Sequence, residues 1–120
     1  LLDKDGYLVI EVPHAKDFLL NNLKSTEFKS ATLWSQHLIL HTRNSLYAFL
    51  KNAGYNEIII QGIQRYSLAN HLHWLVEKKP SGHTSLLSHF ETNQLIDSYE
   101  ASLQSIDATD TLIAIAKNTK

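Results

Sequence analysis

The first informative feature of this 120-residue sequence is what it lacks. It contains no cysteine, which excludes a disulfide framework and a metal site built on thiolates. Its formal net charge is only −1, so we predict neither a nucleic-acid-binding surface nor attraction to an anionic membrane. No apolar run approaches the length needed to cross a bilayer, and no signal peptide is recognisable. These absences predict a cytoplasmic protein whose partners include neither nucleic acid nor membrane.

Methionine is also absent, and the sequence opens on Leu1 and Leu2. A natural gene product begins with methionine, so we expect a fragment or a processed chain. The apolar content of 43% is ordinary for a globular protein, and the length suits one domain or part of one.

The chain is organised around residues 36–66, which hold a capped helix, a glycine stop and an apolar strand. Thr42 or Asn44 can accept hydrogen bonds from the first free amides of the helix. One apolar stripe follows at helical spacing, formed by Leu46, Phe49, Leu50 and Ala53. Gly54 stands where helices commonly end in a left-handed residue. The isoleucine run at 58–60 predicts a strand buried on both faces.

Two more strands are predicted, at residues 7–12 and at Thr111–Lys117, beside the central strand at 57–64. Residues 7–12 are also expected to be buried on both faces, and Pro13 ends that strand because proline cannot donate to the ladder. Between the central and last strands, residues 66–107 read as a helical insertion.

Helices and a loop are predicted for the segments that connect the strands. Residues 15–24 suggest a short helix, and residues 25–32 suggest a polar loop. Ser67 can cap a helix that runs to about Lys78, and a second helix covers residues 92–105. The side chains predicted to face inward from the first of these are Leu68, Leu72, Leu75 and Val76.

The order H-L-x-x-x-T-x-x-S-L-x-x-x-L-x-x-A-G-Y over residues 37–55 resembles the late half of class I S-adenosylmethionine-dependent methyltransferases. Further stretches agree in the same order, namely DKDGYLVIEVP, RYSLANHLHWL, KPSGH and DATDTLIAIAKN. The resemblance covers nearly the whole chain. It implies an α/β fold that is the C-terminal part of a Rossmann-like methyltransferase sheet. In that sheet the last strand inserts between two parallel strands and runs antiparallel to them, within a three-layer arrangement.

The same resemblance implies a function. We expect the substrate-side half of a methyltransferase that uses S-adenosylmethionine and acts on a small molecule such as a sugar. The family's glycine-rich cofactor loop is not in this chain, so no residue is assigned to the cofactor and the fragment alone is predicted to be inactive. The alternative is a non-catalytic α/β binding or assembly module that lacks the cofactor loop.

Candidate catalytic residues follow from the strand ends, because ligands of open α/β sheets bind beyond the carboxyl ends of the strands. Glu11, Pro13 and His14 occupy that edge. A neutral imidazole can take a proton from a methyl acceptor, which makes His14 and His37 the acid/base candidates. The alternative is that both histidines hydrogen-bond to loop backbone.

Three further residues are candidates for binding the substrate. Arg65 and Tyr66 close the central strand at the ligand-facing edge, where Arg65 could bind a carboxylate or phosphate. An ion pair of Arg65 with Glu57 or Asp110 is the alternative. Trp74, with His71 and His73 before it in the same helix, could line an acceptor pocket or could belong to the core.

Seven histidines raise the question of a metal. His71 and His73 are two residues apart, so on a helix they point to different faces. No H-E-x-x-H pattern accompanies them, and we predict no metal site.

Finally, the strand at 7–12 is expected to leave one edge unpaired, flanked by Leu8, Val9 and Ile10. Such an edge is a template for another chain, so we predict self-association of the fragment as a twofold dimer.

Overall fold

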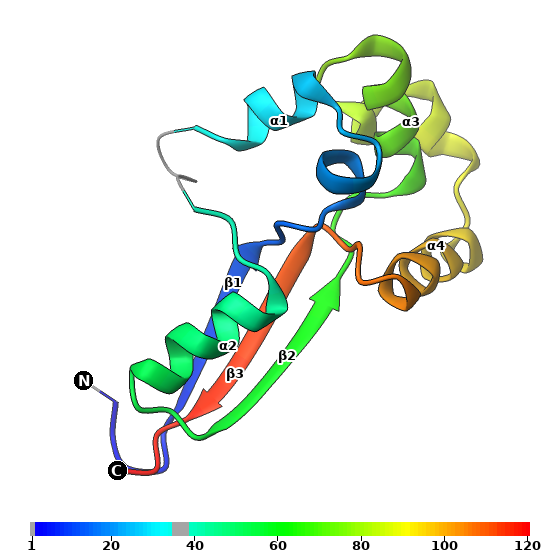
Figure 1. Cartoon of the computed structure of the whole chain (residues 1–120). Coiled ribbons are helices and arrows are strands. Elements are labelled where there is room, and N and C mark those ends of the chain that lie inside the picture. Colours follow the sequence, from blue (N-terminus) through cyan, green and yellow to red (C-terminus); the bar gives the residue numbers. More distant parts are fainter. Residues whose placement is uncertain (1, 35–38) are drawn as a thin grey trace.

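The computed structural model describes residues 2–34 and 39–120. Its three strands, β1 (Tyr7–Pro13), β2 (Glu57–Ile63) and β3 (Thr111–Lys117), form one sheet in the order β1-β3-β2 (Figure 1). β3 pairs antiparallel with both neighbours, so β1 and β2 point in the same direction. The prediction of three strands with an antiparallel last strand in the middle is confirmed. The chain is therefore a small α/β protein with a three-stranded antiparallel sheet.

The helix α2 (Arg43–Asn52) covers one face of this sheet. Between them lies the apolar core, whose buried members are Leu46, Leu50, Leu112, Ala114 and Ala116. Small residues on β3 let the helix approach the central strand closely, and larger side chains on the outer strands flank it.

The ends of α2 follow the sequence signals. Thr42 accepts a hydrogen bond from the Ser45 amide at 3.1 Å, and the Ser45 hydroxyl accepts one from the Thr42 amide at 2.9 Å. This capping box satisfies two amides that have no partner within the helix. Gly54 has a φ of +96°, as its position after the helix predicts. Two members of the predicted apolar stripe, Phe49 and Ala53, are exposed instead, and Phe49 packs its ring against His41.

The opposite face of the sheet is open. Val9 is 63% exposed and Ile59 is 61% exposed, and both are in register with Ile115 on the middle strand. Among the described helices, α2 packs along one face, whereas α4 (Asn93–Ser105) meets the sheet at the Gly62 end of β2. The predicted burial of strands on both faces, and the three-layer arrangement, are therefore wrong for this chain. The strands alternate between one covered face and one open face, the usual pattern of an antiparallel sheet.

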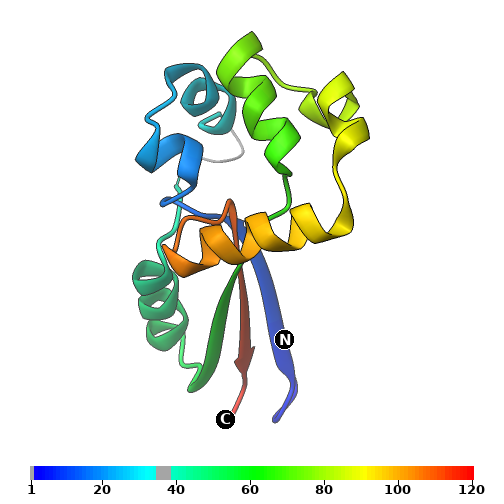
Figure 2. The ribbon, with the colours of Figure 1, turned by 90° about the vertical axis from the view of Figure 1, so that its right-hand side faces the viewer.

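The remaining helical segments gather beyond the carboxyl ends of β1 and β2 (Figure 2). They are the π-helical turn η1 (Phe18–Asn22), α1 (Thr26–Thr32), α3 (Leu68–Glu77), the 3-10 turns η2 (Gly82–Thr84) and η3 (Leu86–Phe90), and α4. Ser67 and Thr92 cap α3 and α4 with their side-chain oxygens. Residues 66–107 are thus mostly helical, as the sequence predicts.

Two local predictions are wrong. Residues 25–32 form α1 rather than a loop, because the Ser25 hydroxyl accepts a hydrogen bond from the Phe28 amide and starts a helix. In α3 the predicted inward residues Leu75 and Val76 are exposed, Val76 by 72%. A more polar side of α3, which includes Asn70, is buried instead, because Gly82 of η2 packs closely against it.

The described ends of the chain lie together, at the end of the sheet opposite the carboxyl ends of β1 and β2 (Figure 1). The Asp5 amide donates to the Asn118 carbonyl at 2.8 Å, and the Asn118 side chain donates to the Leu2 carbonyl at 3.0 Å. In the described part of the chain, no helix combines the length and the apolar character that crossing a membrane requires.

Candidate functional site

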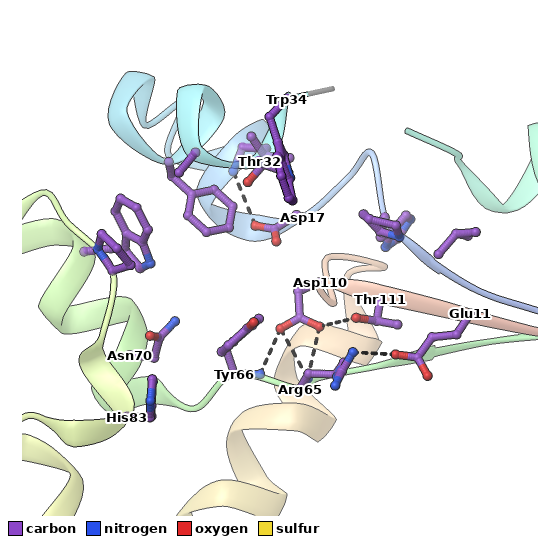
Figure 3. Close-up of a pocket in the computed structure, with 18 of the residues that line it drawn as sticks. Glu11, Asp17, Thr32, Trp34, Arg65, Tyr66, Asn70, His83, Asp110 and Thr111 are labelled. Atoms are coloured by element: carbon purple, nitrogen blue, oxygen red, sulfur yellow. Dashed lines mark hydrogen bonds and ion pairs between the residues drawn. The ribbon is translucent and has the colours of Figure 1, made fainter. Parts of the chain in front are cut away.

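A cavity of about 600 Å³ lies where the carboxyl ends of β1 and β2 meet the helices (Figure 3). Its walls come from the ends of both strands, from α1 and α3, from the turn around η1 and from residues 80–83. β1 and β2 deliver their carboxyl ends to the same edge because both run antiparallel to β3. The cavity therefore stands where ligands of α/β sheets usually bind.

The structure brings most of the predicted site residues together. His14, Arg65, Tyr66 and Trp74 all line this cavity, as does Glu11. The other acid/base candidate, His37, lies outside the described residues.

His14 is fully buried and held by the protein. Its Nδ1 lies 2.9 Å from the Thr109 carbonyl oxygen and donates to it, so the proton of the neutral ring is on Nδ1. Burial lowers the pKa of His14, which keeps the ring neutral. Its Nε2 has no hydrogen-bond partner among the described residues and is closed off from solvent, with Asp107 Oδ1 3.9 Å away. In this conformation His14 anchors loop backbone, which is the alternative that the sequence left open; its acid/base role stays a prediction.

Arg65 joins the two strand ends at the rim of the cavity. Its Nη1 lies 2.7 Å from Glu11 Oε1, and both side chains are largely exposed, so the pair stabilises the fold only slightly. The Arg65 guanidinium forms an ion pair with neither of the two predicted partners. Glu57 lies near Lys117 instead, and Asp110 accepts a hydrogen bond from the Arg65 backbone amide at 3.0 Å.

Asp110 fixes the cavity floor, although sequence reasoning had assigned it only as a possible ion-pair partner. Its buried carboxylate accepts from the amides of Arg65 and Tyr66, from the Thr111 hydroxyl at 2.7 Å and from Gln64 Nε2 at 2.8 Å. The Asp110 amide donates back to Gln64 Oε1 at 3.0 Å. Burial raises the pKa of Asp110, and the bonds from the Arg65 and Tyr66 amides oppose that rise. The residue ties the exit of β2 to the entry of β3.

Aromatic side chains supply the apolar walls. Trp74 is almost fully buried and meets Phe28 edge to face, with ring centroids 5.1 Å apart. Trp74 packs α3 against α1 and also lines the cavity, and its contact with an acceptor stays a prediction. Tyr66 lines the cavity from the end of β2. His71 and His73, the histidines considered together with Trp74, are not among the residues that line the cavity.

Asp17 is a residue that sequence reasoning missed. It is 3% exposed, and its Oδ1 accepts from the Leu19 amide at 2.7 Å and the Leu20 amide at 3.4 Å. Its Oδ2 has no partner in the described chain and, unlike His14 Nε2, is not sealed from solvent. Because Asp17 lines the cavity, this oxygen opens into it; Asp110 lines the same cavity, but Figure 3 shows its carboxylate turned toward the Arg65 and Tyr66 amides. A cap signal before Phe18 was available in the sequence, but nothing there indicated burial.

Burial shifts the pKa of several groups in and behind the cavity. It raises the pKa of Asp17 to about 7, with Asp110 adding to the rise. Behind Asp17, His71 Nδ1 lies 2.5 Å from the Tyr99 hydroxyl. Burial lowers the pKa of His71 to about 4 and raises that of Tyr99 to about 12, where Asp17 and Asp110 contribute. His71 and Tyr99 therefore stay neutral near physiological pH.

The charges that line the cavity sum to a negative field. The Glu11 and Arg65 charges largely cancel, and the Arg65 charge also acts on Asp110, whereas the described chain forms no ion pair with the carboxyl group of Asp17 or Asp110. Within residues 2–34 and 39–120 there is no group of three or more side chains that could hold a metal ion. The arrangement can bind a small molecule and accept a proton from it.

No family model, no curated protein and no solved structure matches this chain.

Proposed function

We propose that this chain is the substrate-side part of an S-adenosylmethionine-dependent methyltransferase that acts on a small molecule. One observation carries the proposal: Arg65, Tyr66 and Trp74 line a cavity at the shared carboxyl ends of β1 and β2. The sheet order supports it, since the resemblance implies an antiparallel last strand between two parallel ones in a Rossmann-like sheet.

The size and lining of the cavity suit a small methyl acceptor. About 600 Å³ is typical of small-molecule sites, which combine apolar walls with a few polar groups. Trp74 and Phe28 can bury an apolar face of the acceptor, while Asn70 and Arg65 orient its polar groups. Asp17 Oδ2 can receive the proton that the acceptor loses, because a base with a pKa near the working pH is efficient.

The cofactor would supply an electrophilic methyl group when bound. These 120 residues contain no glycine-rich turn for it, so the proposal assigns its binding to no residue here. The proposal also keeps the acid/base role of His37, which lies outside the described residues.

The direct test is methyl transfer by the gene product that contains this chain. We expect that product to bind S-adenosylmethionine and to transfer a methyl group to a small molecule, and we expect the 120-residue chain alone to do neither. A gene product that shows no S-adenosylmethionine binding by calorimetry would refute the proposal. Micromolar binding by the chain alone would refute the assignment of the cofactor site to other residues.

The second candidate is a binding module that transfers no group. The observation that favours it is that the cavity is walled by the described residues without any cofactor loop. Ligand binding by the gene product, with no S-adenosylmethionine binding and no methyl transfer, would select this candidate.

A further inference from the structure

We propose that the cavity binds a protonated organic amine, with the Asp17 carboxylate as its counter-ion. This inference deepens the proposed function, because it names the chemical class of the methyl acceptor. It rests on the proposed function only for the methylation of the bound amine. The binding itself is independent of methyl transfer and is tested without it.

The free oxygen of Asp17 is the first ground. Asp17 is only 3% exposed, yet Oδ2 has no hydrogen-bond partner in the described chain and opens into the cavity. A buried carboxylate is costly unless a cation or donors satisfy it. An ammonium group carries both the opposite charge and the N–H donors that Oδ2 lacks.

The surrounding charges are the second ground. Asp110 adds a second carboxylate to the same space, but hydrogen-bond donors already occupy both of its oxygens. Arg65, the cation of the rim, is engaged by Glu11. A cationic ligand would therefore meet attraction from Asp17 and Asp110, whereas an anionic ligand would meet repulsion from both.

The aromatic walls are the third ground. Trp74, Phe28 and Tyr66 line the space into which Asp17 opens. Aromatic ring faces attract cations and bury the apolar part of an amine. The combination of one free carboxylate with aromatic rings favours an amine over a neutral hydroxyl compound of the same shape.

The test compares three matched probes on the 120-residue chain by calorimetry: benzylamine, benzyl alcohol and benzoate. At about pH 8 we expect benzylamine to bind about 10- to 100-fold more tightly than benzyl alcohol, the gain typical of a charge-assisted hydrogen bond, and benzoate to bind no more tightly than benzyl alcohol. At about pH 5 the preference for the amine should shrink, because Asp17 then holds a proton.

Three other titratable groups in or behind the cavity do not produce the same pH effect: Tyr99, His71 and His14, whose pKa is lowered by burial, which favours the neutral ring. Tyr99 and His71 stay neutral from about pH 5 to about pH 8, as their shifted pKa values require. Burial raises the pKa of Asp110 as well as that of Asp17, so variants are needed to separate the effects of the two carboxyl groups.

Asp17→Asn removes the charge and keeps the shape and the helix cap, since asparagine caps as well as aspartate. We expect it to abolish most of the preference for benzylamine while leaving benzyl alcohol binding unchanged. Asp17→Ser, which also caps, serves as a second neutral variant if the asparagine variant fails to fold. Asp97→Asn removes the same charge from the exposed side of α4 and is the matched control, with no effect expected.

Equal binding of benzylamine and benzyl alcohol at about pH 8, or no binding of either, would overturn the inference, as would a folded neutral Asp17 variant that keeps the amine preference. These outcomes differ from failure of the proposed function. A chain that binds benzylamine through Asp17, in a gene product without methyl transfer, would uphold this inference and refute only the methyltransferase proposal.

Discussion

Two buried aspartates in one cavity show how neighbouring side chains of the same type take different roles. Asp110 receives hydrogen bonds from two backbone amides, a hydroxyl and an amide side chain, which leaves it a structural group. Asp17 is as deeply buried but receives backbone amides on one oxygen only. The number of donors, rather than the depth of burial, makes Asp17 available to a ligand.

The shifted pKa of Asp17 predicts a pH-dependent stability. Its folded-state pKa of about 7 exceeds the ordinary value of 3.8, so the folded state binds more protons between these values. Stability from this group is therefore full below about pH 4 and is lost as the pH rises through about 7. We expect Asp17→Asn to remove this loss and to raise the free energy of unfolding at about pH 8 by roughly 1–4 kcal/mol.

Urea unfolding of wild type and Asp17→Asn between about pH 4 and pH 8 checks this prediction. His71 acts in the opposite direction, because its lowered pKa makes stability rise with pH between about 4 and 6.5. Since both proteins contain His71, the difference between their curves isolates Asp17. Parallel curves would contradict the prediction.

At the scale of elements, the strands and the capped helix α2 could be predicted from the sequence because their signals are local. Runs of β-branched residues, Thr42 before the helix and Gly54 after it all act within a few residues. The buried side of α3 could not be predicted, since Asn70 is covered by Gly82 of η2, which lies in a separate turn. The open sheet face was missed because an isoleucine run looks the same for one-sided and two-sided burial.

The site was predictable in part for the same reason. Arg65 and Tyr66 follow directly from the end of a strand, and His14 from the end of another, so topology alone brings them to one edge. Asp17 lies in a turn with no strand or motif to mark it. Its importance depends on contacts with elements distant in sequence, which one-dimensional spacing does not reveal.

The link between β2 and β3 can be tested through Asp110. Asp110→Ala leaves the amides of Arg65 and Tyr66 without their acceptor, which should lower the free energy of unfolding by roughly 2–4 kcal/mol. Asp110→Asn retains one carbonyl oxygen and should cost less. Chemical denaturation measures both, with Asp97→Ala on the exposed side of α4 as the control. A loss of unfolding free energy no larger than that of the control would show that the hydrogen bonds of Asp110 do not stabilise the fold.

At the scale of the whole molecule, the exposed sheet face and the outer edges of β1 and β2 dominate the behaviour expected in solution. The open row of Val9, Ile115 and Ile59 crosses all three strands, and in the described chain neither outer strand has a second partner. Unpaired strand edges beside an apolar face favour pairing with another chain.

We expect the 120-residue chain to form a twofold dimer at high micromolar concentration, joined through β1 or the face beside it. Val9→Lys places a charge in the open apolar row and should weaken dimerisation by about tenfold or more. Lys51→Ala, a change on the exposed side of α2, should have no effect. Light scattering over a concentration series measures the association, and a wild-type chain that stays monomeric throughout would contradict the prediction.

The two described chain ends lie together at the end of the sheet opposite the cavity, and this has a practical consequence. Asp5 and Asn118 are already hydrogen-bonded, and both lie at the opposite end of the sheet from the cavity. A short flexible linker could therefore join residue 120 to residue 2, and new ends could be opened in an exposed turn that does not line the cavity. A circular permutant of this kind would keep the cavity intact, and fluorescent labels attached near Asn118 would report on the fold without touching the ligand.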